Sequence, residues 1–366
     1  MAGGDEMALG GERLPTVSIR DVAAASGVSH QTVSRVINGS PRVKESTRQV
    51  VLRSVASLDF HPNRAARALA GAPVQSVTVL TANTRLYGFA GALEGIEAAA
   101  RVAGFTVGVR VVEPGAQAAD DAVSQAVELG GALIVIALEQ KSIAALHAVP
   151  SDFPSAAIVV TPTVDEAVGK PWVWIDDRKA ATEATNYLLG LGHRTVHYLS
   201  VPAWADTNPR LTGWRSALVD AGAPVPEPLC CSWEPRSGFE AGQVLTSDPD
   251  VTAVLCGNDD IAIGALRAMH HAGRSVPADV SIVGFDDIPF ALYCSPSLTT
   301  VRQDFVALGR LCFARLVSLL DPSSTDQWPP CPEAKLIIRE SAGPPHKRRR
   351  RGPVASRPRL LPAPSR

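Results

Sequence analysis

Hydrophobic and polar positions follow two patterns along this chain. From residue 18 to residue 58, apolar side chains recur at helical spacing in three short runs. From residue 76 onward, short apolar runs alternate with helical stretches. Residues 62–73 and 343–366, which are rich in Pro, Ala and Arg, follow neither pattern. The chain therefore predicts a small helical domain, a large α/β core and two segments without a core of their own.

The first pattern begins with two short helices and a tight turn. Ser18 and Asp21 form a capping-box-like start, and Gly27 can adopt the left-handed backbone that ends a helix. Ser29 is a candidate N-cap for a second helix over residues 30–38. Helices joined in this way make a helix-turn-helix, whose second helix enters the major groove of DNA. That helix would present an apolar edge of Val33, Val36 and Ile37 and, on its other side, His30, Gln31, Ser34 and Arg35.

A third amphipathic helix is predicted at about residues 45–58. Its buried stripe would be Val51, Val55 and Leu58, with Arg48 and Arg53 outside. The alternative is an ordinary helical hairpin whose polar side chains are merely solvated. Side-chain chemistry favours the DNA-binding interpretation over the hairpin, because Gln can bond two atoms of adenine and Arg two atoms of guanine.

The second pattern predicts parallel sheets, because repeated β-α-β units need helices on both faces of a sheet. Two such blocks, with a join near residues 163–177 and a return near 288–303, indicate two lobes with a cleft between them. Ligands bind sheets of this kind at the carboxyl ends of the strands. The expected strands are SVTVLT, FTVGVRVV, ALIVIAL and SAAIVVT, all read as buried, then TVHYLS, VTAVLC and VSIVGF. The expected helices are 89–103, 117–129, 178–191, 208–222, 237–246 and 259–272.

Composition is that of a globular protein in a reducing compartment. The chain has 366 residues, of which 46% are hydrophobic and 19% charged, so two or three domains are expected. No segment approaches the roughly 18 to 20 apolar residues of a membrane span. The first 16 residues lack the basic start and apolar run of a secretory signal. Six scattered Cys form no disulfide framework, so we expect a cytoplasmic protein.

Charge is segregated along the chain. Residues 17–72 carry eight Lys or Arg against three acids, and residues 343–366 carry eight against none. Residues 73–342 carry 18 against 30 acids. A small basic unit followed by a large acidic one indicates that the first meets an anionic polymer and the second does not.

Signatures of catalysis are missing from the sequence. There is no G-x-x-x-x-G-K loop, no G-x-S-x-G elbow and no H-E-x-x-H helix. The eight His show no metal-binding spacing, and adjacent carboxylates such as Asp176–Asp177 point apart. We therefore expect no enzyme, no metal and no cofactor.

The segments SIRDVAAASGVSHQTVSRVING and HPNRAARALAG closely resemble the DNA-binding start and the hinge of the lac repressor family of bacterial regulators. The resemblance continues to about residue 340. It implies paired hinge helices, one from each subunit of a homodimer, that insert Leu69 into the minor groove. A plain linker is the alternative for this segment. The residues that the resemblance implies in DNA binding are Ser29, His30, Gln31, Thr32, Ser34, Arg35, Asn38, Asn63, Arg64 and Leu69.

The same resemblance implies an effector site at the strand ends of the core. Arg, Asn and Asp can bind neighbouring hydroxyls, and an indole can cover the apolar face of a sugar ring. Each residue also has a simpler role, since Asp259, Asp260 and Asp287 could cap helices, Trp233 could be core and Arg210 a surface charge. The effector-binding residues implied by the resemblance are Leu86, Tyr87, Phe89, Arg210, Trp233, Asn258, Asp286 and Gln303.

The predicted fold class is α/β. A disordered N-terminus (1–16) precedes a helix-turn-helix domain (17–61), a hinge (62–73), a two-lobed core like periplasmic binding proteins (74–342) and a disordered basic tail (343–366). Lobe one would comprise about 76–175 and 290–303, and lobe two about 176–289 and 304–340. The tail either adds nonspecific DNA affinity or has no role.

We expect a repressor that binds a palindromic operator as a dimer and responds to a galactoside-like or other mono- or disaccharide, with no membrane partner. The alternatives are a soluble sugar-binding protein for uptake and an α/β enzyme acting on sugars.

Overall fold

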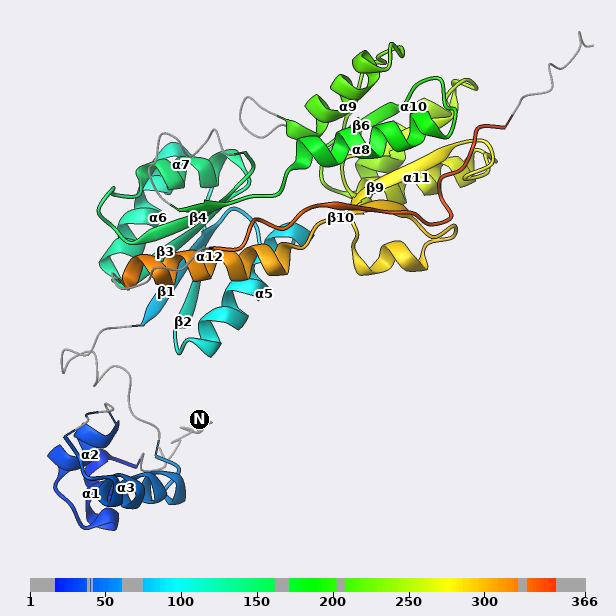
Figure 1. The fold of residues 1–366 in the computed structure, drawn as a ribbon. Coiled ribbons are helices and arrows are strands. Elements are labelled where there is room, and N and C mark those ends of the chain that lie inside the picture. Colours follow the sequence, from blue (N-terminus) through cyan, green and yellow to red (C-terminus); the bar gives the residue numbers. More distant parts are fainter. Residues whose placement is uncertain are drawn as a thin grey trace, which may run out of the picture. The chain divides into compact units, whose positions relative to one another are not determined.

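The computed structural model describes residues 17–37, 40, 42–60, 75–161, 171–202, 208–321 and 328–346 (Figure 1). The chain divides into two compact units, one ending at Val74 and one beginning at Gln75. The expectations for the N-terminus, the hinge and the polybasic part of the tail lie outside the described residues.

The first unit contains three helices, as predicted: α1 (Ile19–Ser26), α2 (His30–Ile37) and α3 (Glu45–Ser57). The Asp21 carboxylate accepts hydrogen bonds from the Ser18 backbone N–H at 2.7 Å and from the Ser18 hydroxyl at 2.8 Å. Gly27 has a φ of 67° and ends α1 in the left-handed conformation. The three helices surround a small core of Val22, Val33, Val36, Val51 and Phe60.

Arg48 was predicted to face outward from α3, but the structure places its side chain against the chain. Its side chain is 22% exposed, and its Nη2 donates to the Ser40 carbonyl at 2.6 Å. A long side chain on the edge of α3 can reach back over the preceding turn, so Arg48 holds that turn in place. Arg53 is exposed as expected.

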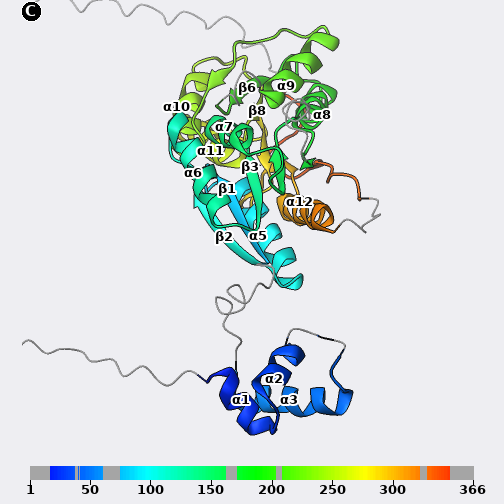
Figure 2. The same ribbon diagram turned by 90° about the vertical axis from the view of Figure 1, so that its left-hand side faces the viewer.

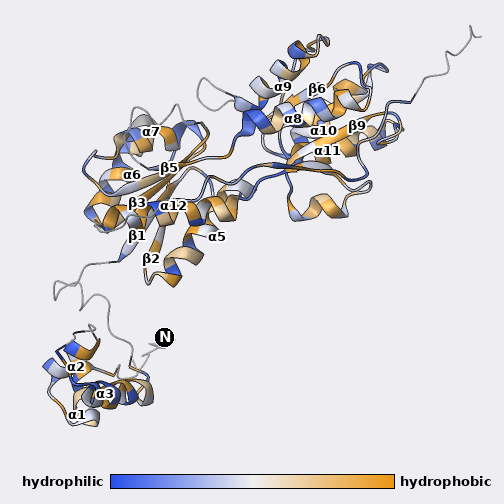
Figure 3. Ribbon diagram, in the orientation of Figure 1, coloured by the Kyte–Doolittle hydropathy of each residue, from blue (hydrophilic) through white to orange (hydrophobic). Residues whose placement is uncertain are grey.

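The first lobe of the core is built on a parallel sheet with the order β2-β1-β3-β4-β5. Alternate residues of β3 enter opposite cores: Ile134 packs beneath α5 and α12, and Leu133 packs beneath α6 and α7. Hydrophobic residues follow the strands accordingly (Figure 3). The strands are β1 (Ser76–Thr81), β2 (Thr106–Val111), β3 (Ala132–Ala137), β4 (Ser155–Val159) and β5 (Trp172–Val173). The helices are α5 (Tyr87–Val102), α6 (Ala116–Glu128), α7 (Gln140–Ala148) and α12 (Phe305–Leu320).

The second lobe is built on a sheet with the order β11-β10-β9-β8-β6-β7, in which β11 alone of the described strands is antiparallel. One core lies beneath α8 and α9, and the other beneath α10 and α11. The strands are β6 (His197–Ser200), β7 (Leu229–Cys230), β8 (Ala253–Cys256), β9 (Ser281–Asp286), β10 (Thr299–Arg302) and β11 (Lys335–Ile337). The helices are α8 (Asp177–Gly190), α9 (Pro209–Asp220), α10 (Pro235–Thr246), α11 (Asp259–His271) and the 3₁₀ segment η2 (Pro289–Tyr293).

The predicted division of the last segments between the lobes is wrong for β10 and α12, whereas β11 lies in the second sheet as predicted. Residues 290–303 were expected in lobe one, but β10 pairs with β9 in the second sheet. Residues 304–340 were expected in lobe two, but α12 packs beside α5 on the first sheet (Figures 1 and 2). The apolar face of α12 completes the core that α5 begins, which explains its place. The chain therefore changes lobes before α8, between β10 and α12, and again before β11.

One strand differs in burial from its prediction. FTVGVRVV was expected to be buried, yet β2 is largely exposed because it is an edge strand of its sheet. Among the described residues, no helix is long and apolar enough to cross a membrane.

Candidate functional site

Helix α2 presents a polar face of the kind that DNA bases can bind. Val33 and Val36 on its other face are buried in the small core, so the orientation of the helix is fixed. His30, Gln31 and Arg35 are exposed, while Thr32 and Ser34 are half-buried. Asn38, Asn63, Arg64 and Leu69, the other predicted DNA-binding residues, lie outside the described residues.

The start of α2 is held by Ser29. Its hydroxyl accepts from the Thr32 backbone N–H at 3.2 Å, and the Ser29 and Thr32 hydroxyls lie 3.0 Å apart. The N-cap prediction is thereby confirmed. These hydroxyls lie at the positively polarised end of the helix, where a phosphate oxygen could bind.

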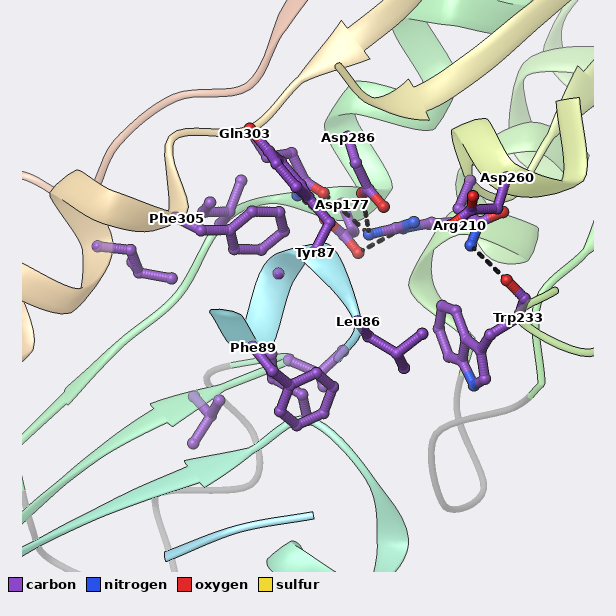
Figure 4. A pocket seen from close by; sticks show the side chains of 17 residues that line it. Leu86, Tyr87, Phe89, Asp177, Arg210, Trp233, Asp260, Asp286, Gln303 and Phe305 are labelled. Atoms are coloured by element: carbon purple, nitrogen blue, oxygen red, sulfur yellow. Dashed lines mark hydrogen bonds and ion pairs between the residues drawn. The ribbon is translucent and has the colours of Figure 1, made fainter. Parts of the chain in front are cut away.

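In the core, a cavity of about 640 Å³, including the solvent at its mouth, brings together all eight residues predicted to bind an effector (Figure 4). Sequence reasoning missed nine further lining residues: Gly88, Leu138, Val159, Val160, Ile175, Asp177, Asp260, Phe305 and Leu308.

Arg210 lies at the centre of the polar side of the cavity. Near the start of α9 it is only 5% exposed, so the surface-charge alternative is excluded. Its Nε donates to Asp177 Oδ2 at 2.8 Å, and its Nη2 donates to Gln303 Oε1 at 2.9 Å and to Asp286 Oδ1 at 3.3 Å. Its Nη1 donates to the Gly257 carbonyl. The guanidinium also lies over the Phe285 ring, 4.1 Å from the centroid.

Asp177 and Gln303 connect Arg210 to the segments between the lobes. Asp177 is the first residue of α8, and Gln303 lies between β10 and α12. The Gln303 amide donates to Asp177 Oδ1 at 2.5 Å. Two of the chain's passages between lobes are therefore joined in one buried hydrogen-bond network, in which Arg210 is the shared donor.

Asp286 is held in an unusual state at the end of β9. Its φ of 106° is one that residues with a side chain rarely adopt, and such strain is concentrated at functional sites. Burial raises the pKa of its carboxyl to about 7, although the Arg210 guanidinium opposes this rise. Asp286 can therefore accept hydrogen bonds from a ligand in a place that water reaches poorly.

Asn258 and Trp233 form the far side of the cavity. Asn258 caps α11, because its side-chain Oδ1 accepts from the Ile261 N–H at 2.8 Å, and its side-chain Nδ2 donates to the Trp233 backbone carbonyl at 3.3 Å. Asn258 thus fixes the loop that carries the indole. Trp233 is half-buried and lines the cavity, so it is not simply a core residue.

The helix-capping alternatives for the neighbouring acids fail, because Asn258 is the N-cap of α11 and Ile288 is the N-cap of η2. Asp259 accepts instead from the Thr300 hydroxyl at 2.5 Å and from the Ile288 N–H at 2.8 Å. Asp287 pairs with Arg302 at 2.6 Å and Arg339 at 2.7 Å. Asp260 lines the cavity, and burial raises its pKa.

The first lobe contributes an apolar wall. Phe89 and Phe305 are almost fully buried, and Leu86 lies between Phe89 and Trp233 in Figure 4. A Cβ on Gly88 would meet the Phe305 ring at 2.9 Å, so a glycine is needed for this close approach. Tyr87 packs edge-on against Phe305, with centroids 6.2 Å apart. Burial raises the pKa of Tyr87, and the nearby carboxylates, led by Asp286, raise it further.

Two family models match this chain. Residues 18–63 match the lacI family of bacterial regulatory proteins, and residues 185–342 match a periplasmic binding protein-like domain. The HTH-type transcriptional regulator GalR of Escherichia coli (strain K12) is 30% identical over 338 residues, which cover 90% of this chain and 96% of that protein.

Solved structures resemble the chain over similar lengths. The lac repressor dimer bound to operator and the anti-inducer ONPF is 29% identical, with a TM-score of 0.77, over 90% of this chain and all of that chain. The complex of the transcriptional regulator CelR with cellobiose is 27% identical, with a TM-score of 0.63, over 89% of this chain and all of that chain.

Proposed function

This chain belongs to the lacI family of bacterial regulatory proteins, and from that premise we propose a repressor that binds a palindromic operator as a homodimer and is controlled by a small sugar in the core cavity. Two copies of α2 would enter the major groove at half-sites about one helical turn apart. The proposed site of action is the cytoplasm, where operator DNA is found.

The observation that carries the effector part of this proposal is the cavity around Arg210. Carboxylate and amide groups from several strand ends converge there, and an indole lies opposite. Convergent acceptors beside an aromatic ring suit a polyhydroxylated ring. The relative CelR has been solved with cellobiose, which supports a sugar for this chain as well.

We propose no catalytic step for this cavity. Its polar groups already bond one another through Arg210. Among the described lining residues, we find no acid and base positioned on either side of a nucleophile. The similar proteins compared above are transcriptional regulators. Turnover of a labelled sugar by the pure protein would overturn this part of the proposal.

The DNA-binding part is tested by using the full chain to select binding sites from random double-stranded DNA. The selected site is then titrated with the protein to measure affinity. Arg35→Ala should lower affinity for that site by about 1–3 kcal/mol and relax its sequence preference. Arg53→Ala, which removes an equal charge from the exposed side of α3, is the matched control.

The control should keep its preference and change affinity little. Equal losses in the two variants would mean that only net charge matters, and that Arg35 does not bind a base.

The effector part is tested by a thermal-shift screen of the full chain against sugars and purines, because a ligand of the folded state raises the melting temperature by mass action. A sugar that raises it should also release the selected operator. A purine that does so, with no sugar active, would contradict the proposed effector.

A further inference from the structure

Several hydrogen bonds fix the place where the chain leaves the core. Ser341 is fully buried, and its hydroxyl accepts from the Thr299 N–H at 2.8 Å and donates to the Ile282 carbonyl at 2.6 Å. The Gly343 N–H donates to the Ser281 hydroxyl at 3.0 Å. Because Ser281 is the first residue of β9, this segment is held at the start of that strand.

His193 holds the same segment through its buried ring. Its Nε2 lies 3.0 Å from the Gly343 carbonyl and its Nδ1 lies 3.0 Å from the Thr252 hydroxyl. Burial lowers the pKa of the imidazole and so favours the neutral ring, which donates at one nitrogen and accepts at the other. Since a carbonyl can only accept, Nε2 is the donor. Residues 341–343 are therefore an integral part of the second lobe, and the residues that follow start from a fixed place.

This place lies at the opposite end of the core from the point where the chain enters it. The chain enters at Ser76, the first residue of β1. Asp286, at the end of β9, and Leu86, which follows β1, both line the core cavity, so the starts of the two strands lie away from it on opposite sides. Each strand has six residues and is about 20 Å long, which separates the two ends of the core by roughly 40 Å or more (Figures 1 and 2).

A strongly basic segment follows the anchored end directly. Residues 343–366 contain seven Arg and one Lys but no acid, and five of these cations are consecutive, at residues 347–351. Residues 73–342 carry 18 Lys or Arg against 30 acids. Because the core itself is acidic, it repels a polyanion, and any attraction at this end comes from the basic run.

The chemistry of the run fits the phosphates of nucleic acid. An Arg side chain can bind two phosphate oxygens with its planar fork of N–H groups. Five cations can replace about five condensed counterions on double-stranded DNA, and such binding needs no particular base sequence. In any conformation the run extends at most about 18 Å from His346. It therefore stays near the far end of the second lobe and does not reach the point where the DNA-binding unit joins the core.

We propose that residues 347–351 bind a second segment of double-stranded DNA, without sequence preference, while the helix-turn-helix holds the operator. Two DNA-binding parts that leave the core at opposite ends are placed to hold two segments rather than one. This inference goes beyond the proposed function, since neither the cavity nor its ligand takes part in it.

A bridging assay with the full chain tests the inference. The selected operator is fixed to beads and saturated with protein, and a labelled duplex of unrelated sequence is then added. The parent should capture this duplex at about 50 mM salt and release it by about 200 mM, because replacing about five counterions makes the affinity fall roughly 500-fold over that range.

Two variants separate the run from net charge. The test variant removes the five consecutive cations: Lys347→Gln, Arg348→Gln, Arg349→Gln, Arg350→Gln and Arg351→Gln. The matched control removes five exposed cations from the core: Arg101→Gln, Arg215→Gln, Arg236→Gln, Arg267→Gln and Arg310→Gln. The test variant should lose capture by about tenfold or more and keep its affinity for the operator within about twofold, whereas the control should capture as the parent does. Melting curves establish that each variant is folded.

Equal capture by the parent and the test variant, or an equal loss in both variants, would overturn the inference. A test variant that loses affinity for the operator as strongly as it loses capture would also overturn it, since the run would then bind the operator DNA itself. Flotation with vesicles of phosphatidylcholine and phosphatidylserine distinguishes a membrane partner. Vesicle binding that depends on the run, without capture of the duplex, would refute DNA as the partner.

Discussion

Replacing Asp286 with Asn should remove a large part of the pH dependence of the stability of the core. Asp286 is 8% exposed at the end of β9, with the Arg210 Nη2 3.3 Å away. Burial outweighs that guanidinium and raises the pKa of the carboxyl from 3.8 to about 7. Asn has the same shape and can still accept from Arg210, but it does not titrate.

The sign of the effect follows from where the proton is bound. Because the folded-state pKa is above the unfolded one, the folded protein holds a proton between about pH 4 and pH 7 that the unfolded chain has released. The stabilisation from this proton is complete below pH 3.8 and is lost as the pH rises through 7. At about 1.4 kcal/mol per pKa unit, the loss amounts to about 4 kcal/mol.

Urea unfolding between pH 4 and pH 8, followed by tryptophan fluorescence, measures the effect. All six Trp lie at residue 172 or later, so the signal reports on the core and not on the helix-turn-helix. The unfolding free energy of Asp286→Asn relative to the parent should rise by about 4 kcal/mol up to pH 7 and then level off.

Asp220→Asn, at the exposed end of α9, is the control that removes a carboxylate from the same unit. A difference between Asp286→Asn and the parent that stays flat, or that falls with rising pH, would refute the reasoning. It would mean that Arg210, rather than burial, determines the charge of Asp286.

Two further substitutions test the packing and the capping. Gly95→Ala should destabilise the first lobe by about 3 kcal/mol in urea unfolding, because the added Cβ would meet the Val306 carbonyl oxygen at 2.0 Å and force α5 from α12. Gly108→Ala is the control, because there is open space around its Cβ, and it should cost far less stability. Equal losses of stability in the two variants would contradict this reason. Asp21→Ala should speed hydrogen exchange of the α1 amides, since it removes both bonds from Ser18; unchanged rates would show that the capping box contributes nothing.

The strands were predictable because burial on both faces of a parallel sheet leaves a continuous apolar run in the sequence. ALIVIAL became β3, in which every residue is buried. Strands β5 and β7 have two residues each, which is too short for any periodicity to be visible. The helix-turn-helix was predictable because its capping residues lie next to the helices they cap.

The lobe to which an element belongs could not be read from local pattern. The four residues of β10 and the helix α12 carry no signal for one sheet over the other, since that choice depends on which exposed core each one covers. The same limit applies to the cavity wall. Val160 and Phe305 have the composition of core residues, and only the fold places them against a ligand site.

Asp177 was missed for a related reason. In the sequence it is one of two adjacent acids at a helix start, where a capping role is the simpler expectation. Asp176 does cap α8, by accepting from the Lys179 N–H at 2.9 Å, which leaves Asp177 to turn inward to Arg210. A pair of acids at such a position, with a buried Arg elsewhere, is the signal that could have found it.

The division of the cavity between lobes also bears on control. A ligand can shift the lobes only if it binds one of their arrangements more tightly than another. A molecule held by the polar groups of the second lobe alone would move with that lobe and bind every arrangement equally. A molecule that also buries an apolar group on Leu86 and Phe305 gains that contact only where the first lobe lies against it. The apolar wall is therefore one part of the site that can convert binding into a movement of the lobes, and the hydrogen bonds of Arg210 with Asp177 and Gln303, which lie on the connections between the lobes, are the other.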